Sequence, residues 1–155
     1  MKKLLTLFIL WLIQFSAVYT PSVLAQKVDY NGVWTGNATV DFGFGMREKF
    51  EYELILTQKK NKIKGVSTTV LTIKSKKYTA KAEIEGEVNG KFLKCYETHN
   101  IQEDKIPNSG WIPFSKMELI YRIKTDTNYP TLEGLYQCPD GSNGRLILEK
   151  KPPRV

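Results

Sequence analysis

The sequence predicts an all-β domain of about eight antiparallel strands that close into an up-and-down β-barrel, with a β-sandwich as the alternative. Three observations support this prediction. Apolar and polar residues alternate with a period of two in several runs, no stretch keeps a 3.6-residue apolar period long enough for a secure helix, and turn-forming residues separate the runs. Eight strands are enough to close a small barrel around a packed core or one small ligand.

The first 25 residues have the three parts of a secretory signal peptide of bacterial type. They begin with the basic Met1-Lys2-Lys3, continue with an apolar run over 4–13, and end with Val23-Leu24-Ala25. A membrane anchor is the alternative, but a spanning helix needs about 20 continuous apolar residues and Gln14 interrupts the run. We therefore expect cleavage of residues 1–25, export to the periplasm or the medium, and one domain over 26–155 without a transmembrane segment.

Alternation and intervening turns define the first four predicted strands. The first begins at Gly32-Val33-Trp34, and the second alternates aromatic or aliphatic residues with charged ones from Phe50 onward. A lysine-rich turn leads into the third. The fourth has small and apolar residues on one face, among them Ala80 and Ala82, and Thr, Lys and Glu on the other. These strands are predicted at 33–42, 50–58, 62–71 and 78–88.

The last four strands follow in the same manner. Asn89-Gly90 fits the two central positions of a type I′ hairpin turn, and a Gly- and Asn-containing turn at 140–144 precedes the final strand. These strands are predicted at 91–99, 116–125, 131–137 and 145–150. The connection over 100–114 is long for a hairpin and carries Trp111, so we expect it to fold over one barrel end, as a plug or as a functional lid.

Charge and composition point away from a nucleic-acid partner. The formal net charge of +7 falls to +5 once Lys2 and Lys3 leave with the signal peptide. Basic clusters at 59–64 and 74–77 coincide with predicted turns, where solvated hairpin tips account for them. We expect a monomer that binds no nucleic acid.

No motif for catalysis, phosphate binding or metal binding stands out in the chain. The single histidine, His99, lies two residues after Glu97, and in a regular strand the two side chains would point the same way. Such a pair is the basis of an enzymatic alternative, but a metal site normally needs three or four ligands. The expectation is a protein without enzymatic activity, metal or cofactor.

Cys95 and Cys138 are the only cysteines, and export would place them where disulfides persist. A bond between them would contribute roughly 4 kcal/mol in the chain-entropy model. In a plain meander, however, another strand separates theirs, which puts the backbones about 9–10 Å apart against a limit of about 7 Å. A disulfide and two free thiols remain equal alternatives.

Gly32-Val33-Trp34 resembles the G-x-W start of the calycin barrels, which include lipocalins, fatty-acid-binding proteins and avidins. The resemblance implies that Trp34 closes the barrel bottom and that a basic residue of the last strand, Arg145, lies across its ring. It extends to strand number and meander order over the mature chain. The chain is shorter than a lipocalin and lacks the helix that follows the last lipocalin strand, so the resemblance carries no ligand with it.

Two binding functions follow from these features. The first is uptake of a small hydrophobic or amphipathic ligand in the barrel interior, where small residues leave space and tyrosines offer aromatic bodies with polar tips. The second is a non-catalytic cell-envelope module that contacts a protein or glycan through the 100–114 loop. The residues expected to contact a ligand are Tyr52, Ala82, Trp111, Tyr121 and Tyr136.

Overall fold

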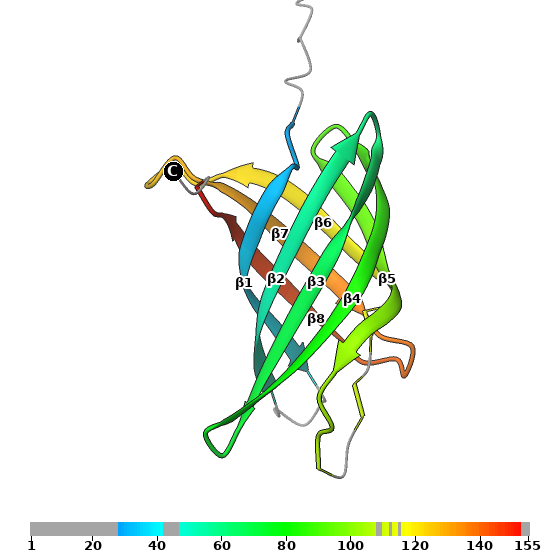
Figure 1. Cartoon of the computed structure of the whole chain (residues 1–155). Coiled ribbons are helices and arrows are strands. Elements are labelled where there is room, and N and C mark those ends of the chain that lie inside the picture. The colour runs from blue at the N-terminus through cyan, green and yellow to red at the C-terminus, as the bar shows by residue number, and fades with distance from the viewer. Residues whose placement is uncertain (1–27, 42–46, 108–109, 112, 115, 153–155) are drawn as a thin grey trace, which may run out of the picture.

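The computed structural model is a closed barrel of eight antiparallel strands (Figure 1). It describes residues 28–41, 47–107, 110–111, 113–114 and 116–152, so the expected signal peptide lies outside the described residues. The strands are β1 (Gly32–Asp41), β2 (Arg47–Lys59), β3 (Lys62–Ile73), β4 (Lys76–Asn89), β5 (Phe92–Glu103), β6 (Lys116–Ile123), β7 (Pro130–Gln137) and β8 (Asn143–Lys150).

Each strand pairs with its neighbour in sequence, and β1 closes the barrel by pairing with β8. The closing register runs from Trp34 opposite Lys150 to Asp41 opposite Asn143. The predicted eight-stranded up-and-down barrel is therefore confirmed, and the sandwich alternative is wrong. The main difference in strand bounds is at β5, which continues to Glu103 and so includes residues expected in the following loop.

One hairpin turn differs from the sequence prediction. The β4–β5 register pairs Asn89 with Phe92, so the turn residues are Gly90 and Lys91. Only Gly90 has a positive φ, of 58°, which is the φ pattern of a type II′ turn and rules out the expected type I′ turn. The type I′ pattern occurs instead at the β3–β4 turn, where Lys74 and Ser75 both have positive φ.

The interior is packed along most of the barrel. The inward-facing side chains interdigitate as the two-residue alternation predicts, and the largest of them are less than 2% exposed. This packed core contains Trp34, Leu54, Ile63, Ile84, Leu93, Met117, Leu119, Leu132, Leu146 and Leu148. Side chains thus fill most of the barrel interior, and space for a ligand can remain only near one end of the barrel.

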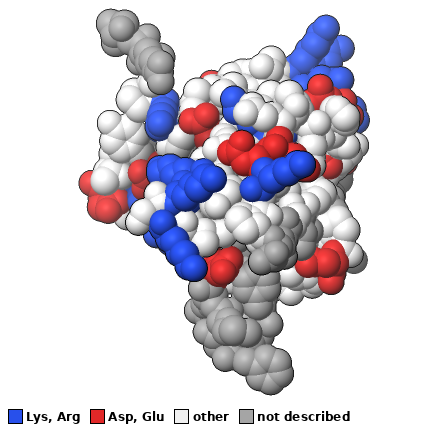
Figure 2. Space-filling model, turned by 60° about the horizontal axis from the view of Figure 1, so that its bottom comes forward, with Lys and Arg blue, Asp and Glu red and all other residues white. Residues whose placement is uncertain are grey.

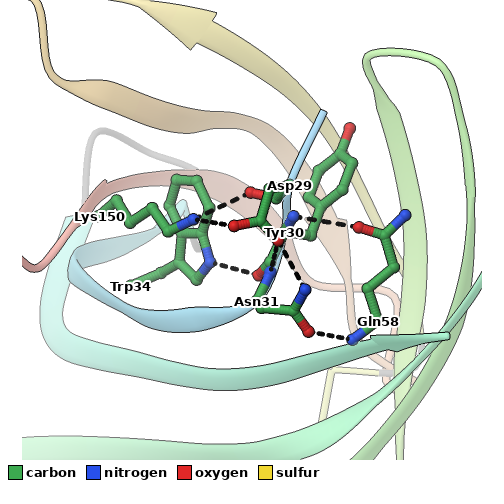
Figure 3. A network of polar contacts seen from close by, with 6 residues as sticks. All are labelled: Asp29, Tyr30, Asn31, Trp34, Gln58 and Lys150. Atoms are coloured by element: carbon green, nitrogen blue, oxygen red, sulfur yellow. Dashed lines mark hydrogen bonds and ion pairs between the residues drawn. The ribbon is translucent and has the colours of Figure 1, made fainter. Parts of the chain in front are cut away.

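One end of the barrel is sealed by the segment that precedes β1 (Figure 3). The rings of Tyr30 and Trp34 are fully buried, and the Trp34 Nε1–H donates to the Tyr30 carbonyl oxygen at 2.9 Å. The Tyr30 hydroxyl donates to the carbonyl of Gly90 at 3.2 Å across the barrel. In Figure 1 this sealed end is the upper one, where β1 begins and β8 ends.

A basic residue of β8 does lie over the Trp34 ring, but it is Lys150 and not the expected Arg145. The Lys150 ammonium is 5.3 Å from the ring centroid and donates to the carbonyl and carboxylate oxygens of Asp29 at 3.0 and 3.1 Å. Arg145 pairs with Thr39 at the far end of β1 and forms an ion pair with Glu133. The closing register of β1 on β8 explains the difference, because it places Lys150 opposite Trp34.

Candidate functional site

The end opposite the Trp34 seal contains a cavity of about 160 Å³. Strands β1 to β5 supply its wall, and the β5–β6 and β7–β8 connections supply its rim. Figure 2 turns this end toward the viewer and shows acidic and basic side chains interspersed there. The lining is mostly apolar, from Val40, Phe50, Leu71, Ala80, Ala82, Ile106, Trp111, Pro113 and Phe114.

The cavity exists because small side chains of β3 and β4 face it. Ala82 lies opposite Ser67, and Ala80 lies opposite Thr69 in the β3–β4 register. All four residues line the cavity. Since these inward positions hold no large side chain, the core packing stops short of this end. The sequence prediction that the small residues of this strand leave space is confirmed.

Glu97 reaches the cavity from β5 because its strand position points inward. Leu93 and Cys95, two and four residues earlier, are buried in the core, and Glu97 continues their face. A β-bulge follows: Ile84 of β4 pairs with Glu97 but Ala82 pairs with Asn100, so β5 has one extra residue there. Glu97 and Asn100 therefore both line the cavity.

The bulge overturns the expectation that Glu97 and His99 point the same way. His99 is exposed and does not line this cavity. Thr98 and His99 share the place opposite Glu83, so the alternation changes phase between Glu97 and Asn100. Glu97 and His99 do line a separate shallow pocket together, but only Glu97 lines the cavity, and no described hydrogen bond joins the two side chains.

Three uncharged donors hold the Glu97 carboxylate. Its Oε1 accepts from the Tyr52 hydroxyl at 2.8 Å and from the Ser67 hydroxyl at 2.6 Å, and its Oε2 accepts from the Phe114 backbone N–H at 2.7 Å. Burial raises the pKa of Tyr52 well above its ordinary value, and the adjacent negative charge of Glu97 adds to this. Tyr52 thus keeps its proton and donates a hydrogen bond to the carboxylate.

Phe114 connects the β5–β6 segment to the barrel interior. Its ring stacks between two tyrosines, with centroid separations of 5.0 Å to Tyr52 and 4.0 Å to Tyr136. Its carbonyl also accepts from the Glu97 backbone N–H at 3.1 Å. Phe114 is buried and caps the packed core, so the floor of the cavity is aromatic and this part of the segment acts as a plug.

The five residues expected to contact a ligand are distributed over different parts of the barrel. Ala82 and Trp111 line the cavity, and the Trp111 Nε1–H donates to the carbonyl of Asp104 at 2.8 Å. Tyr52 and Tyr136 lie against Phe114 without lining the cavity. Tyr121 lies at the sealed end, 6.2 Å from the Trp34 ring centre, and takes no part in the cavity.

Sequence reasoning missed Glu97, Ser67 and Phe114 as parts of one site. The signal for Glu97 was present in the alternation, because Leu93, Cys95 and Glu97 are spaced by two residues. The convergence of Ser67 and Phe114 on it depends on the strand register and on the path of the β5–β6 segment. Neither can be read from local sequence pattern.

Both cysteines are buried free thiols in this structure, and no disulfide joins them. Burial raises the pKa of Cys95 to about 12, because the thiolate would have to form inside the core, and the negative charge of Glu97 adds to this. Cys138 lines the cavity. Within the described ranges, no cluster of three or more His, Cys, Asp or Glu side chains is arranged to bind a metal ion.

Comparisons with known proteins give no family. No protein-family model matches the chain, and searches of curated proteins and of solved structures find no significant similarity. The part of the chain that the structure describes has no helix of the length and apolarity needed to cross a bilayer. The barrel agrees with the architecture that the calycin resemblance implied.

Proposed function

We propose that this protein is an exported, non-enzymatic barrel of calycin type that binds one small hydrophobic or amphipathic molecule in the cavity at its open end. The observation that carries the proposal is the cavity of about 160 Å³ above a packed core, with an apolar lining and a few polar groups. Such a lining is typical of sites that bind small molecules.

The size of the cavity limits the ligand. An apolar cavity of about 150 Å³ holds a molecule the size of benzene, and sites for drug-sized ligands have about 300–1,000 Å³. Because the lining includes rim residues such as Trp111 and Pro113, a longer ligand would extend past them into solvent. The proposed ligand therefore inserts one ring or a short alkyl chain.

The envelope-module alternative is less well supported by the positions of the loop residues. The apolar anchor of such a module would consist of Trp111, Ile112 and Phe114. Ile112 lies outside the described residues, and Phe114 is 6% exposed and turns toward the barrel interior. The Trp111 indole N–H is already satisfied by a backbone carbonyl. These contacts use Phe114 and the Trp111 indole within the protein itself, while Ile101 of the same segment is 52% exposed.

Titration of the purified protein with benzyl alcohol tests the proposal. We expect one-to-one binding, measured by calorimetry and by a change in the fluorescence of Trp111, which lines the cavity. The variant Ala82→Phe should prevent binding because its ring would occupy the space that the ligand needs. Trp111→Phe identifies the fluorescence that belongs to the site.

Thr57→Phe is the matched control, since it adds an aromatic ring on the exposed outer wall of β2. It should bind benzyl alcohol as the unaltered protein does. Circular dichroism would confirm that both variants keep the β-barrel. No binding of benzyl alcohol or other single-ring compounds to the unaltered protein would refute the proposed function.

A further inference from the structure

We propose that the ligand carries a protonated amine, and that Glu97 is the residue that binds it. This inference rests on the proposed function and defines its ligand class as an amphipathic amine, with an apolar body on the aromatic floor and an ammonium group at the carboxylate. The observation behind this inference is the Glu97 carboxylate, which lies on the inner wall of an otherwise largely apolar cavity and is oriented by neutral donors.

The hydrogen bonds around Glu97 leave room for one more donor. An ionised carboxylate has about four acceptor positions, two on each oxygen. Tyr52 and Ser67 use both positions on Oε1, and the Phe114 N–H uses one on Oε2. Among the described contacts, the second position on Oε2 remains for a ligand N–H.

The described partners of Glu97 include no protein cation that would neutralise its negative charge. Among the described residues no ion pair includes Glu97, and the three groups that hold it are uncharged. Lys81 lines the same cavity, as does Glu48, but neither forms an ion pair with a described residue. A half-buried carboxylate with only neutral partners attracts a cation more strongly than a solvated one does, because water screens it less.

Further groups in the cavity suit an ammonium ion. Such a group has three N–H donors. Asn100 also lines the cavity, and because its Nδ2 donates to Glu103 at 3.1 Å, its side-chain carbonyl oxygen is the atom that could accept from the ligand. Trp111 lines the cavity as well, whereas both faces of the Phe114 ring are covered by Tyr52 and Tyr136. An aromatic ring attracts cations through its quadrupole, so Trp111 favours an amine over an anion of the same shape.

The competing explanation is that Glu97 serves only to hold Phe114 in place. A purely structural role needs an acceptor for the Phe114 N–H but no net charge, and it predicts no discrimination among ligands by charge. Binding of an amine predicts a strong dependence on ligand charge. Three probes with one benzene ring and different charges separate the two: benzylamine, benzyl alcohol and benzoate.

Calorimetric titration at pH 7 should give a clear order of affinity. A hydrogen bond to a charged group is worth more than a neutral one, so benzylamine should bind about tenfold to a hundredfold more tightly than benzyl alcohol. Benzoate should bind more weakly than benzyl alcohol. Raising the salt concentration should weaken the binding of benzylamine and leave that of benzyl alcohol nearly unchanged.

The variant Glu97→Gln removes the charge and keeps an acceptor for Phe114. It should bind benzyl alcohol within about threefold of the unaltered protein and lose most of the preference for benzylamine. Glu83→Gln is the matched control, because Glu83 is an exposed strand glutamate that does not line the cavity. It should keep the preference.

Each result decides between the proposals. Equal affinities for benzylamine and benzyl alcohol in the unaltered protein, or tight binding of benzoate, would overturn the assignment of an amine ligand and leave the binding function intact. A preference that survives in Glu97→Gln would overturn the role of Glu97. Failure of all three probes to bind would refute the proposed function itself. The comparison of probes on the unaltered protein needs no variant, so it holds even if Glu97→Gln fails to fold.

Discussion

Replacement of Phe114 by alanine should destabilise the barrel much more than replacement of an exposed phenylalanine. Phe114 is 6% exposed, whereas Phe92, on the outer surface of β5, is 60% exposed. A phenylalanine side chain offers about 200 Å² of surface, and burial is worth about 25 cal/mol per Å². Nearly complete burial then gives almost 5 kcal/mol for Phe114, and burial of less than half gives about 2 kcal/mol for Phe92.

Alanine retains part of this contact, so the expected losses are smaller than these totals. We expect Phe114→Ala to lower the free energy of unfolding by about 3–4 kcal/mol, including the two ring stacks, and Phe92→Ala to lower it by about 1 kcal/mol. Urea unfolding followed by circular dichroism measures both. Equal losses in the two variants would show that Phe114 does not cap the core, and the aromatic floor of the cavity would then be wrong.

Three further predictions concern the sealed end and the buried polar groups. Lys150→Met should lower the free energy of unfolding by about 1–2 kcal/mol because Trp34 loses its cation, while Arg145→Ala should be nearly neutral. Urea unfolding measures both variants. A larger loss in Arg145→Ala would contradict the role of Lys150 as the cation over Trp34. Because burial raises the pKa of Cys95 to about 12, the unfolded chain releases the thiol proton at a lower pH than the folded protein does. The free energy of unfolding should therefore fall as the pH rises from about 9 toward 12, and it should fall less in Cys95→Ala. The Tyr136 hydroxyl is buried without a hydrogen-bond partner among the described residues, so Tyr136→Phe should raise the free energy of unfolding by about 1 kcal/mol, and a loss would indicate a partner for that hydroxyl.

The closed barrel could be predicted because the alternation of apolar and polar residues in each strand indicates which of its faces is buried. In β2, Tyr52, Leu54 and Leu56 are buried as their spacing indicates, and in β4 Ala82 and Ile84 are buried while Glu83 between them is exposed. Alternation fixes which side of a strand is dry, and turn residues fix where neighbours begin. Alternation and turn residues are both local properties of the sequence, and they are nearly sufficient to specify a meander, in which each strand pairs with its neighbour in sequence.

The contents of the two barrel ends could not be predicted in the same way. Which basic residue of β8 meets Trp34 depends on the stagger between the first and last strands, which are the farthest apart in sequence. The choice of Lys150 over Arg145 is a property of barrel closure. In the same way, the bulge in β5 changes the phase of the alternation after Glu97, and a one-residue insertion in a strand leaves no sign in a pattern read one strand at a time.

Glu97 differs from Glu85 and Glu87 in the side of the wall on which it lies. Glu85 and Glu87 of β4 face outward and pair with Lys64 and Lys62 of β3, which are solvated pairs of small energetic value. Glu97 is the same residue type on an inward position, where a hydrophobic side chain would continue the face of Cys95 and where an ionised group costs desolvation. Sequences that fold well keep such exceptions mainly where function requires them. The exception coincides here with the cavity, and a bound cation would offset part of this desolvation cost. Ligand binding to the folded protein should therefore raise its stability, by about 2.7 kcal/mol at a ligand concentration of 100 times Kd.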